Sequence, residues 1–489
     1  MMKCRWLFAA VCYLCAAAGT EGASVGEKVL GYQLDISRCK VPKIETLYRM
    51  VDVLSALGYN QFQLYTEHTF AYRAHETVWC ESSPMTHEEV RRLDAYCAAR
   101  GVELVPNQNS FGHLQRWLRH PEYNDLAEAP QGGSTMSSDY TLRYPMCLCP
   151  GDLRCEKLVA GLYDELFPCF RSRFVNVGGD ETVELKDDHV PRVGRSAAAI
   201  AASSPERVYL SFLMKLHGLC AERGHRMMFW GDIILARPEL IPELPKDVVC
   251  LNWGYEAQHP FERQAAAFEA AGRDFIVCPG TSSWGSLSGR TANMMGNITN
   301  AFGAAERHGA LGVLLTDWND GGSPQPWIVS VPAIVFAANC ARGKVLSRET
   351  LAGEVDKLLG VRCGESLLAY GDVYQKVRGC NDGSEFFHIL EKGQEHPRGA
   401  GVTDETIRAG LAQARYAKSL ADLSRAPEWV RDDFALLDLL YRAVEMRIME
   451  PGKKNFRACF EPEYRRLWLR GNRRGGLSES LNWVFGFVR

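Results

Sequence analysis

The sequence predicts an α/β protein that consists of a (β/α)₈ TIM barrel and an α-helical C-terminal domain. From about residue 28 to residue 340, short apolar runs alternate with amphipathic segments, which is typical of a parallel sheet covered by helices. Eight such units fit a closed barrel. An open doubly wound sheet is the alternative, but no Gly-x-Gly-x-x-Gly motif follows the first run. The domains are expected at residues 24–340 and 341–489.

The expected strands are short apolar runs bounded by turn residues, and the expected helices have apolar residues at helical spacing. We expect strands at residues 29–34, 61–65, 102–106, 174–177, 226–230, 248–253, 275–279 and 312–317. We expect helices at residues 43–57, 87–100, 152–166, 206–223, 260–271 and 291–308, and later at 403–421 and 428–448. Two long loops, at residues 114–150 and 183–205, follow the third and fourth strands and are expected to build part of a substrate pocket.

Residues 1–23 are expected to be a secretory signal peptide. Lys3 and Arg5 precede an apolar stretch of 13 residues, Trp6 through Ala18, which is too short to cross a bilayer. Small residues follow this stretch and suit cleavage near Ala18 or Ala23. A wrong start site or an uncleaved anchor is the alternative. We therefore expect an exported protein, in a periplasmic, extracellular or lysosome-like compartment, with no membrane span after cleavage.

The composition argues against several classes of partner. A net charge of −3 gives no electrostatic attraction to nucleic acid, so no nucleic-acid partner is expected. Three of the 17 cysteines lie in the leader, and many of the others sit inside apolar runs, so we expect mostly buried free thiols. No set of Cys and His residues has the spacing of a zinc site, and we expect neither a metal nor a cofactor. A homodimer is an open alternative.

The strongest functional signal follows the fourth expected strand. Gly178 and Gly179 come after its apolar residues, and Asp180 and Glu181 follow directly. Neighbouring side chains on a strand point to opposite faces, but a kink at the glycines can turn both acids into one cavity. Two carboxyl groups in different surroundings can hold different pKa values and do different work. The pair therefore predicts acid-catalysed cleavage of a sugar bond; a solvated turn or a helix N-terminus is the alternative.

Polar and aromatic residues stand at the ends of the other expected strands, where barrels place their catalytic groups. Arg38 can donate to two sugar hydroxyls, with Asp35 holding it. Four tryptophans follow strands five to eight and can wall a pocket for a sugar ring with an acetamido group. The candidate catalytic residues are Asp180 and Glu181, and the candidate substrate-binding residues are Asp35, Arg38, Glu67, His68, Asn109, His113, Trp230, Trp253, Tyr255, Trp284, Trp318 and Asp320.

Together these residues resemble glycoside hydrolase family 20, the β-N-acetylhexosaminidases, over roughly residues 28–330. The resemblance implies that Glu181 protonates the leaving oxygen and that Asp180 holds and polarises the 2-acetamido group of the substrate. The carbonyl oxygen of that group would attack the anomeric carbon and give an oxazolinium ion with net retention, which is the substrate-assisted exception among glycosidases. The matching motifs are Asp35-Ile36-Ser37-Arg38, Pro106 through His113, Gly178-Gly179-Asp180-Glu181 and Trp318-Asn319-Asp320.

The same resemblance implies an exo-acting enzyme. Arg38 and Asp320 would grip the outer hydroxyls of a terminal β-linked GlcNAc or GalNAc on a glycan or glycoconjugate. The sequence departs from the family at Asn107 and Asn109, where the family usually has Glu and Asp, so we expect weaker electrostatic support of His113 and a higher pH optimum. The tyrosine that commonly follows the seventh strand is not evident, and Tyr255 is the expected substitute. These departures, together with the missing small N-terminal domain, imply a divergent branch of the family.

Three other hypotheses stay open. One is a barrel glycosidase of different sugar specificity, in which Asp180 or Glu181 works with a distant carboxylate such as Glu67 or Asp320. Another is a secreted glycan-binding barrel that has lost activity, which the asparagines of the third strand end favour. The third is a metal-dependent hydrolase, which is the weakest because the sequence offers no His pair at ligand spacing.

Overall fold

The computed structural model describes residues 28–130, 144–186, 194–380, 383–392, 399 and 401–486. The expected signal at residues 1–23 lies outside these residues and stays a prediction, as does part of each long loop. All eight expected strands are present in one sheet, in the order β3-β2-β1-β8-β7-β6-β5-β4. They are β1 (Val29–Asp35), β2 (Gln61–Tyr65), β3 (Glu103–Val105), β4 (Phe174–Asn176), β5 (Arg226–Trp230), β6 (Val249–Trp253), β7 (Asp274–Cys278) and β8 (Gly312–Asp317).

The sheet closes on itself between its two end strands, β3 and β4. All the paired strands are parallel, and Asn107 forms a further parallel bridge with Asn176. The backbone N–H of Gln108 donates to the Asn176 carbonyl (3.0 Å), and the N–H of Asn176 donates to the Pro106 carbonyl (2.9 Å). The (β/α)₈ barrel is therefore confirmed, and the open doubly wound sheet is excluded.

The longer helices of the barrel begin and end within two residues of the expected limits, except α13, which was not expected from the sequence. Local signals explain several of these ends. Thr86 and Glu89 form a reciprocal capping box at the start of α3. Helix α1 ends at Gly58, which has a φ of 86°, in the left-handed region that favours glycine. These helices are α1 (Ile44–Leu57), α3 (His87–Ala98), α6 (Leu153–Leu166), α9 (Pro205–Glu222), α11 (Phe261–Ala270), α12 (Thr291–Arg307) and α13 (Val331–Cys340).

Short helices occupy the loops between these elements, and several of them border the C-terminal ends of the strands. One of them, α10, begins directly after β5 and carries a residue of the candidate site. They are α2 (Glu76–Trp79), α4 (Gln115–Leu118), α5 (Pro121–Asn124), η2 (Phe167–Cys169), α7 (Val183–Lys186), α8 (Ala197–Ala202), α10 (Asp232–Leu235), η3 (Pro238–Glu243) and η4 (Trp327–Ser330).

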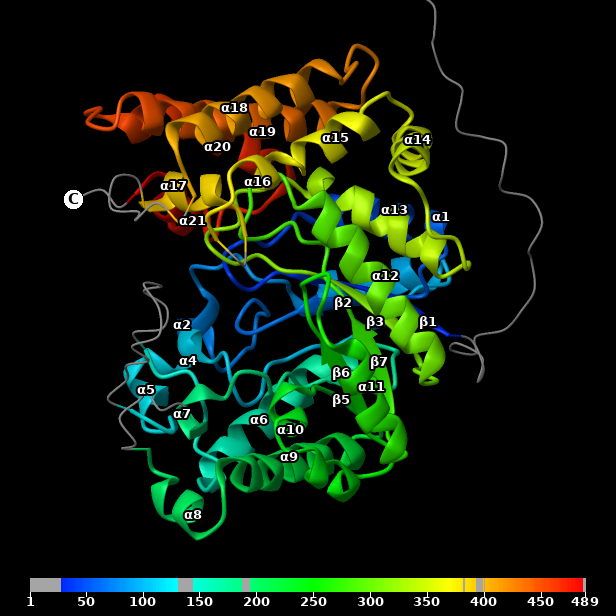
Figure 1. The fold of residues 1–489 in the computed structure, drawn as a ribbon. Coiled ribbons are helices and arrows are strands. Elements are labelled where there is room, and N and C mark those ends of the chain that lie inside the picture. Colours follow the sequence, from blue (N-terminus) through cyan, green and yellow to red (C-terminus); the bar gives the residue numbers. More distant parts are fainter. Residues whose placement is uncertain are drawn as a thin grey trace, which may run out of the picture.

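Helices of the C-terminal region form a layer beside the barrel, at the top of the view in Figure 1. Ion pairs and hydrogen bonds join this layer to the barrel loops: Arg473 contacts Glu89 (2.7 Å), and Arg116 contacts Glu479. The boundary expected at residue 340 stays a prediction. The helices are α14 (Arg348–Leu359), α15 (Gly364–Tyr370), α16 (Val373–Lys376), α17 (Glu385–Lys392), α18 (Asp404–Ser419), α19 (Glu428–Met449), α20 (Phe456–Gly471) and α21 (Leu477–Phe485).

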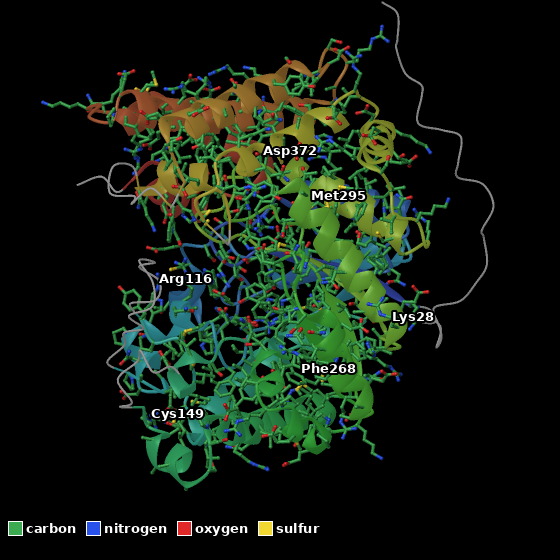
Figure 2. All side chains as sticks on the ribbon, in the orientation of Figure 1. Lys28, Arg116, Cys149, Phe268, Met295 and Asp372 are labelled. Carbon is green, nitrogen blue, oxygen red and sulfur yellow. The ribbon has the colours of Figure 1, made fainter. Side chains whose placement is uncertain are left out.

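Two groups of apolar side chains form the core, and side chains fill the space between barrel and helices (Figure 2). The larger group packs the helices on the strands, and the smaller one fills the barrel and ends at Trp230 and Trp318 near the candidate site. The cysteines of the described residues are free and mostly buried, as expected. Among these residues, none of the helices has both the length and the apolar character that crossing a bilayer requires.

Candidate active site

The backbone after β4 takes a path that glycine makes accessible. Gly178 and Gly179 have φ values of 74° and 93°, in the left-handed region. A Cβ atom on Gly178 would collide with the side chain of Asn109. Glu181 also has a positive φ, of 46°, which is uncommon for a residue with a side chain. The kink removes the strand alternation and turns Asp180 and Glu181 toward the same histidine.

That histidine is His113, and both acids lie at ion-pair distance from it. Its Nε2 is 3.2 Å from Asp180 Oδ2 and 3.4 Å from Glu181 Oε2. Burial alone would lower the pKa of His113, but the two carboxylates raise this pKa well above its usual value. The His113 ring in turn lowers the pKa of Glu181. The three side chains therefore form one charged group, with His113 as its cation.

The two acids differ in their exposure. The side chain of Asp180 is 10% exposed, whereas that of Glu181 is 53% exposed. Within the described residues, Asp180 Oδ1 is buried and has no hydrogen-bond partner. A buried acceptor without a partner is costly, so a ligand that donates a hydrogen bond at this position would be favoured. Asp180 is thus placed to bind a ligand, and Glu181 faces open space.

Asp232 is a member of this site that we did not select from the sequence. Its Oδ2 accepts a hydrogen bond from the backbone N–H of Glu181 (3.1 Å), and its Oδ1 accepts one from Trp253 Nε1 (3.2 Å). Burial and the nearby charge of Asp180 raise the pKa of Asp232 to about 7. Asp232 follows β5 directly, in the same position after its strand as other selected residues, and this was the signal that could have identified it.

A second charged group, centred on Arg38, lines the same cavity. Its Nε donates to Glu67 (3.1 Å), its Nη1 donates to Asp320, and its Nε lies 3.8 Å from Asp35. Burial raises the pKa of Asp35 to about 7, although the Arg38 charge opposes this change. Tyr65 also donates to Glu67 (3.0 Å). The guanidinium is therefore held in one orientation by three carboxyl groups.

Aromatic rings form the remaining wall. Trp318 Nε1 donates to the hydroxyl of Tyr255 (2.8 Å), and the rings of Trp253 and Tyr255 stack at a centroid distance of 5.1 Å. Trp230 packs against Trp318, and its Nε1 has no hydrogen-bond partner within the described part of the chain. The cavity is open to solvent on one side, has a volume of about 240 Å³ and is lined by Arg38, His113, Asp180, Glu181, Trp230, Trp253, Tyr255, Trp318 and Asp320.

Comparison with known proteins identifies the family. The family model described as the glycosyl hydrolase family 20 catalytic domain matches residues 30–284, which is just over half of the chain. The chain belongs to glycosyl hydrolase family 20. The family inferred from the strand-end motifs is therefore confirmed.

Relatives in this family are distant. A β-hexosaminidase of Akkermansia muciniphila is 24% identical over 226 residues, which make up 45% of this chain and 45% of that protein. Hexosaminidase D of Bos taurus is 22% identical over 240 residues, or 47% of this chain and 63% of that protein. The chain thus spans about half the length of the first of these relatives, and less than two thirds of the second.

Solved structures agree with the fold. A chitobiase of Flavobacterium johnsoniae matches 92% of this chain and 77% of its own, with 16% identity and a TM-score of 0.55. A β-N-acetylhexosaminidase of Bacteroides fragilis matches 68% of this chain and 70% of its own, with 17% identity and a TM-score of 0.52. At these identities the likeness supports the barrel fold and not the activity.

Within this family 20 barrel, five of the residues selected from the sequence do not line the cavity. Glu67 lines an adjoining recess of about 140 Å³, which it shares with Arg38 and Glu181. Asp35 and Asn109 are fully buried beneath the cavity, where Asn109 Nδ2 donates to Tyr65 (2.7 Å).

Trp284 and His68 lie further from the acid pair. Trp284 packs edge-on against Tyr255 (4.9 Å between centroids), so it supports the wall from outside. His68 instead lines a separate cavity with Thr69 and Arg119. Burial, reinforced by the nearby arginines, lowers the pKa of His68 well below its usual value. His68 misses the site because neighbouring residues of an extended chain point to opposite sides, and here Glu67 points to the site.

No group of His, Cys, Asp and Glu side chains within the described residues has an arrangement that could hold a metal ion. The charged groups of the site pair with one another, since His113 lies beside the two acids and Arg38 beside Glu67 and Asp320. Asp180 Oδ1 alone of these carboxylate oxygens is buried without a partner among the described residues. This arrangement can hold a hydrogen-bond donor of a ligand next to Asp180, and it can exchange a proton at Glu181.

Proposed function

We propose that this chain is an exo-acting β-N-acetylhexosaminidase, which hydrolyses terminal β-linked GlcNAc or GalNAc by a retaining, substrate-assisted mechanism. The observation that carries the proposal is the arrangement of Asp180 and Glu181 around one cationic histidine, in an open cavity walled by aromatic rings. The names of the relatives point in the same direction, since both are hexosaminidases. The volume of about 240 Å³ suits a single sugar ring.

The first step would join the two acids in one reaction. The buried Asp180 accepts a hydrogen bond from the acetamido N–H of the substrate and so directs its carbonyl oxygen at the anomeric carbon. A bond forms from that oxygen to the anomeric carbon while the glycosidic bond breaks. Glu181 gives its proton to the departing oxygen. The product is an oxazolinium ion, whose positive charge Asp180 stabilises.

The second step would restore the enzyme. Water attacks the anomeric carbon from the side that the leaving group has vacated and opens the oxazolinium ring. The Glu181 carboxylate takes the proton of this water, because the same group must act as acid in one step and as base in the other. Two displacements at one carbon give net retention, with the acetamido group restored.

The Arg38 side of the cavity would define the terminal sugar. Arg38 is held by Asp35, Glu67 and Asp320, and its remaining donors can reach hydroxyl groups at the non-reducing end. The hydroxyl of Tyr255 accepts from Trp318 and has a hydrogen of its own to donate, which suits the acetamido carbonyl. These contacts support the expected substitution of Tyr255 for the usual strand-seven tyrosine. Export and a homodimer remain proposals that rest on the sequence.

Glu181→Gln tests the proposal. The variant keeps the shape of the side chain but cannot give up a proton, so kcat/KM for aryl N-acetylglucosaminides with poor leaving groups should fall by about 10²–10⁴-fold. Substrates with very good leaving groups should lose less, because they need no acid. A wild-type rate in this variant, or sugar binding without turnover by the wild-type protein at any pH, would contradict the proposal. In the second case a glycan-binding barrel would explain the site better.

A further inference from the structure

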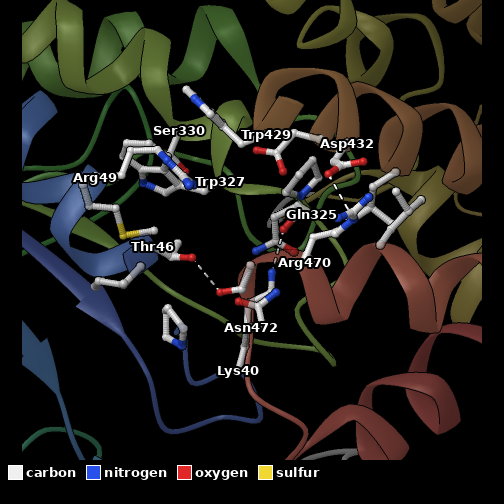
Figure 3. Close-up of a pocket in the computed structure, with 18 of the residues that line it drawn as sticks. Lys40, Thr46, Arg49, Gln325, Trp327, Ser330, Trp429, Asp432, Arg470 and Asn472 are labelled. Atoms are coloured by element: carbon white, nitrogen blue, oxygen red, sulfur yellow. Dashed lines mark hydrogen bonds and ion pairs between the residues drawn. The ribbon is translucent and has the colours of Figure 1, made fainter. Parts of the chain in front are cut away.

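A second cavity lies between the barrel and the C-terminal helices. It has a volume of about 280 Å³ and is bounded by α1, by the segment between β8 and α13, and by α19 and α20 (Figure 3). We call it the interdomain cavity, and the residues that define it below are Lys40, Gln325, Trp327, Trp429, Asp433 and Arg470. It shares no lining residue with the cavity of the acid pair.

The two cavities lie on opposite sides of one stretch of chain. At the end of β8, Trp318 and Asp320 line the cavity of the acid pair, whereas Asp317 and Asn319 line the interdomain cavity. This is the alternation expected for an extended segment. Asn319 is also tied to the catalytic side, since its backbone N–H donates to Asp35 (3.1 Å). The interdomain cavity is therefore a separate hollow behind a shared wall.

Charges around the interdomain cavity are nearly balanced. Arg470 pairs with Glu428 (3.0 Å) and lies 3.5 Å from Asp432. Lys40 donates to the backbone carbonyl of Gln325 (2.7 Å), and burial lowers its pKa to about 8. Burial raises the pKa of Asp433 to about 7. Since the cations and the acids offset one another, the cavity favours a ligand without net charge.

The cavity contains a buried polar atom without a partner. Gln325 is 4% exposed, and its Oε1 has no hydrogen-bond partner among the described residues. Its Nε2 makes only a long contact with the Trp318 carbonyl (3.4 Å). Because proteins rarely leave a buried amide oxygen unpaired, a donor from outside the chain is the expected partner. A ligand hydroxyl would supply it.

Two tryptophans give the same cavity an apolar side. The rings of Trp327 and Trp429 lie 5.9 Å apart, at 41° to each other. Trp327 Nε1 donates to Tyr32 (3.1 Å), and the Arg49 guanidinium lies 5.4 Å from the Trp429 ring. Both rings are thus fixed, and Figure 3 shows them next to the same hollow as Gln325. Fixed aromatic walls with a few placed polar groups are typical of small-molecule sites.

We infer that the interdomain cavity binds an uncharged, hydroxyl-bearing ligand of monosaccharide size. A sugar ring would offer C–H groups to the two tryptophans and a hydroxyl hydrogen to Gln325 Oε1. Its hydroxyl oxygens could accept from the remaining hydrogens of Lys40 Nζ. The inference does not depend on the proposed activity, because none of these residues belongs to the cavity of the acid pair.

The test is a saturation-transfer NMR titration with N-acetylglucosamine, in wild-type protein and in single variants. Gln325→Leu removes the unpaired acceptor, and Trp429→Ala removes one aromatic wall. Each of these two variants should weaken one component of N-acetylglucosamine binding, the one at the interdomain cavity, at least tenfold. Trp253→Ala, in the other cavity, should leave that component unchanged. Tyr416→Ala, on the exposed face of α18, is the matched surface control. Near-UV circular dichroism checks that each variant is folded.

Charged sugars complete the test. The site that Gln325→Leu weakens should discriminate against charge. It should bind glucosamine and glucuronate at least tenfold more weakly than N-acetylglucosamine or glucose. The inference is overturned if no component responds to either Gln325→Leu or Trp429→Ala, or if a charged sugar binds that component best. An inactive protein that still shows the sensitive component would support the interdomain site and contradict only the proposed activity.

Discussion

The two charged ends of the catalytic cavity are built in different ways. At the acid end, positive φ values at Gly178, Gly179 and Glu181 bring side chains together, and one carboxylate oxygen stays unpaired. At the Arg38 end, the guanidinium has carboxylate partners before any ligand arrives. The backbone conformation therefore prepares the acid end for a ligand, whereas ion pairs between side chains prepare the Arg38 end. Changes at the two ends should therefore fail in different ways.

The largest effect is expected at Asp180. Asp180→Asn keeps the size of the side chain but removes the negative charge that would stabilise the oxazolinium ion. We expect kcat/KM for aryl N-acetylglucosaminides to fall by about 10²–10³-fold, since removal of one electrostatic group from a buried site has effects of this size. Steady-state kinetics measure it. A loss confined to KM, with kcat unchanged, would place Asp180 in binding alone.

The next effect concerns the backbone of the acid end. Gly178→Ala adds a Cβ atom against Asn109 at a φ of 74°, so the free energy of unfolding should fall by about 1–3 kcal/mol. Gly101 is a matched control, because its φ is 70° and an added Cβ would meet no atom within 4 Å. Urea denaturation compares the two. Equal losses in both variants would show that packing against Asn109 contributes nothing.

At the Arg38 end, a conservative change should act on binding. Arg38→Lys keeps the charge but loses the fork that contacts Glu67 and Asp320 together, and we expect KM to rise about tenfold with little change in kcat. Arg100→Lys, at the surface pair with Asp52, should change neither. If Arg38→Lys lowered kcat far more than it raised KM, the guanidinium would act in the chemical step and not in substrate binding.

The smallest effect is a change in pH dependence. His113 lowers the pKa of Glu181, and the acid must be protonated to act, so activity is lost as the pH rises through that pKa. In His113→Gln the pKa of Glu181 should rise, and the alkaline limb of kcat/KM should move upward by about 1–3 pH units. His217→Gln, at the surface pair with Asp247, is the control. If the alkaline limb did not move, His113 would not control the pKa of Glu181.

Much of the fold follows from the sequence because its signals are local. Apolar runs bounded by turn residues located all eight strands to within two residues, and the glycines before Asp180 indicated the kink. The upward pH shift expected from Asn107 and Asn109 is not tested by the structure. Even so, the acid pair raises the pKa of His113 without carboxylates at those two positions.

What the sequence did not indicate depends on contacts between distant segments. The place of Asp232 after β5 was a signal in the sequence, but its hydrogen bond with the backbone of Glu181 was not. His68 was selected with Glu67, although adjacent residues face opposite sides. The interdomain cavity needs residues from α1 and α20, which lie hundreds of positions apart. No local pattern brings α1 and α20 together, so tertiary packing alone determines this cavity.

A thiazoline mimic of the oxazolinium ion tests most directly whether the amide of the substrate is the nucleophile. The mimic is assayed as an inhibitor of the wild-type protein and of Asp180→Asn, with an aryl N-acetylglucosaminide as substrate. If the substrate's own amide is the nucleophile and Asp180 stabilises it, the mimic should inhibit the wild type competitively, and inhibition should weaken by at least about 10²-fold in the variant. Hydrolysis that the mimic does not inhibit, with plain glucosides cleaved at an equal rate, would contradict this mechanism.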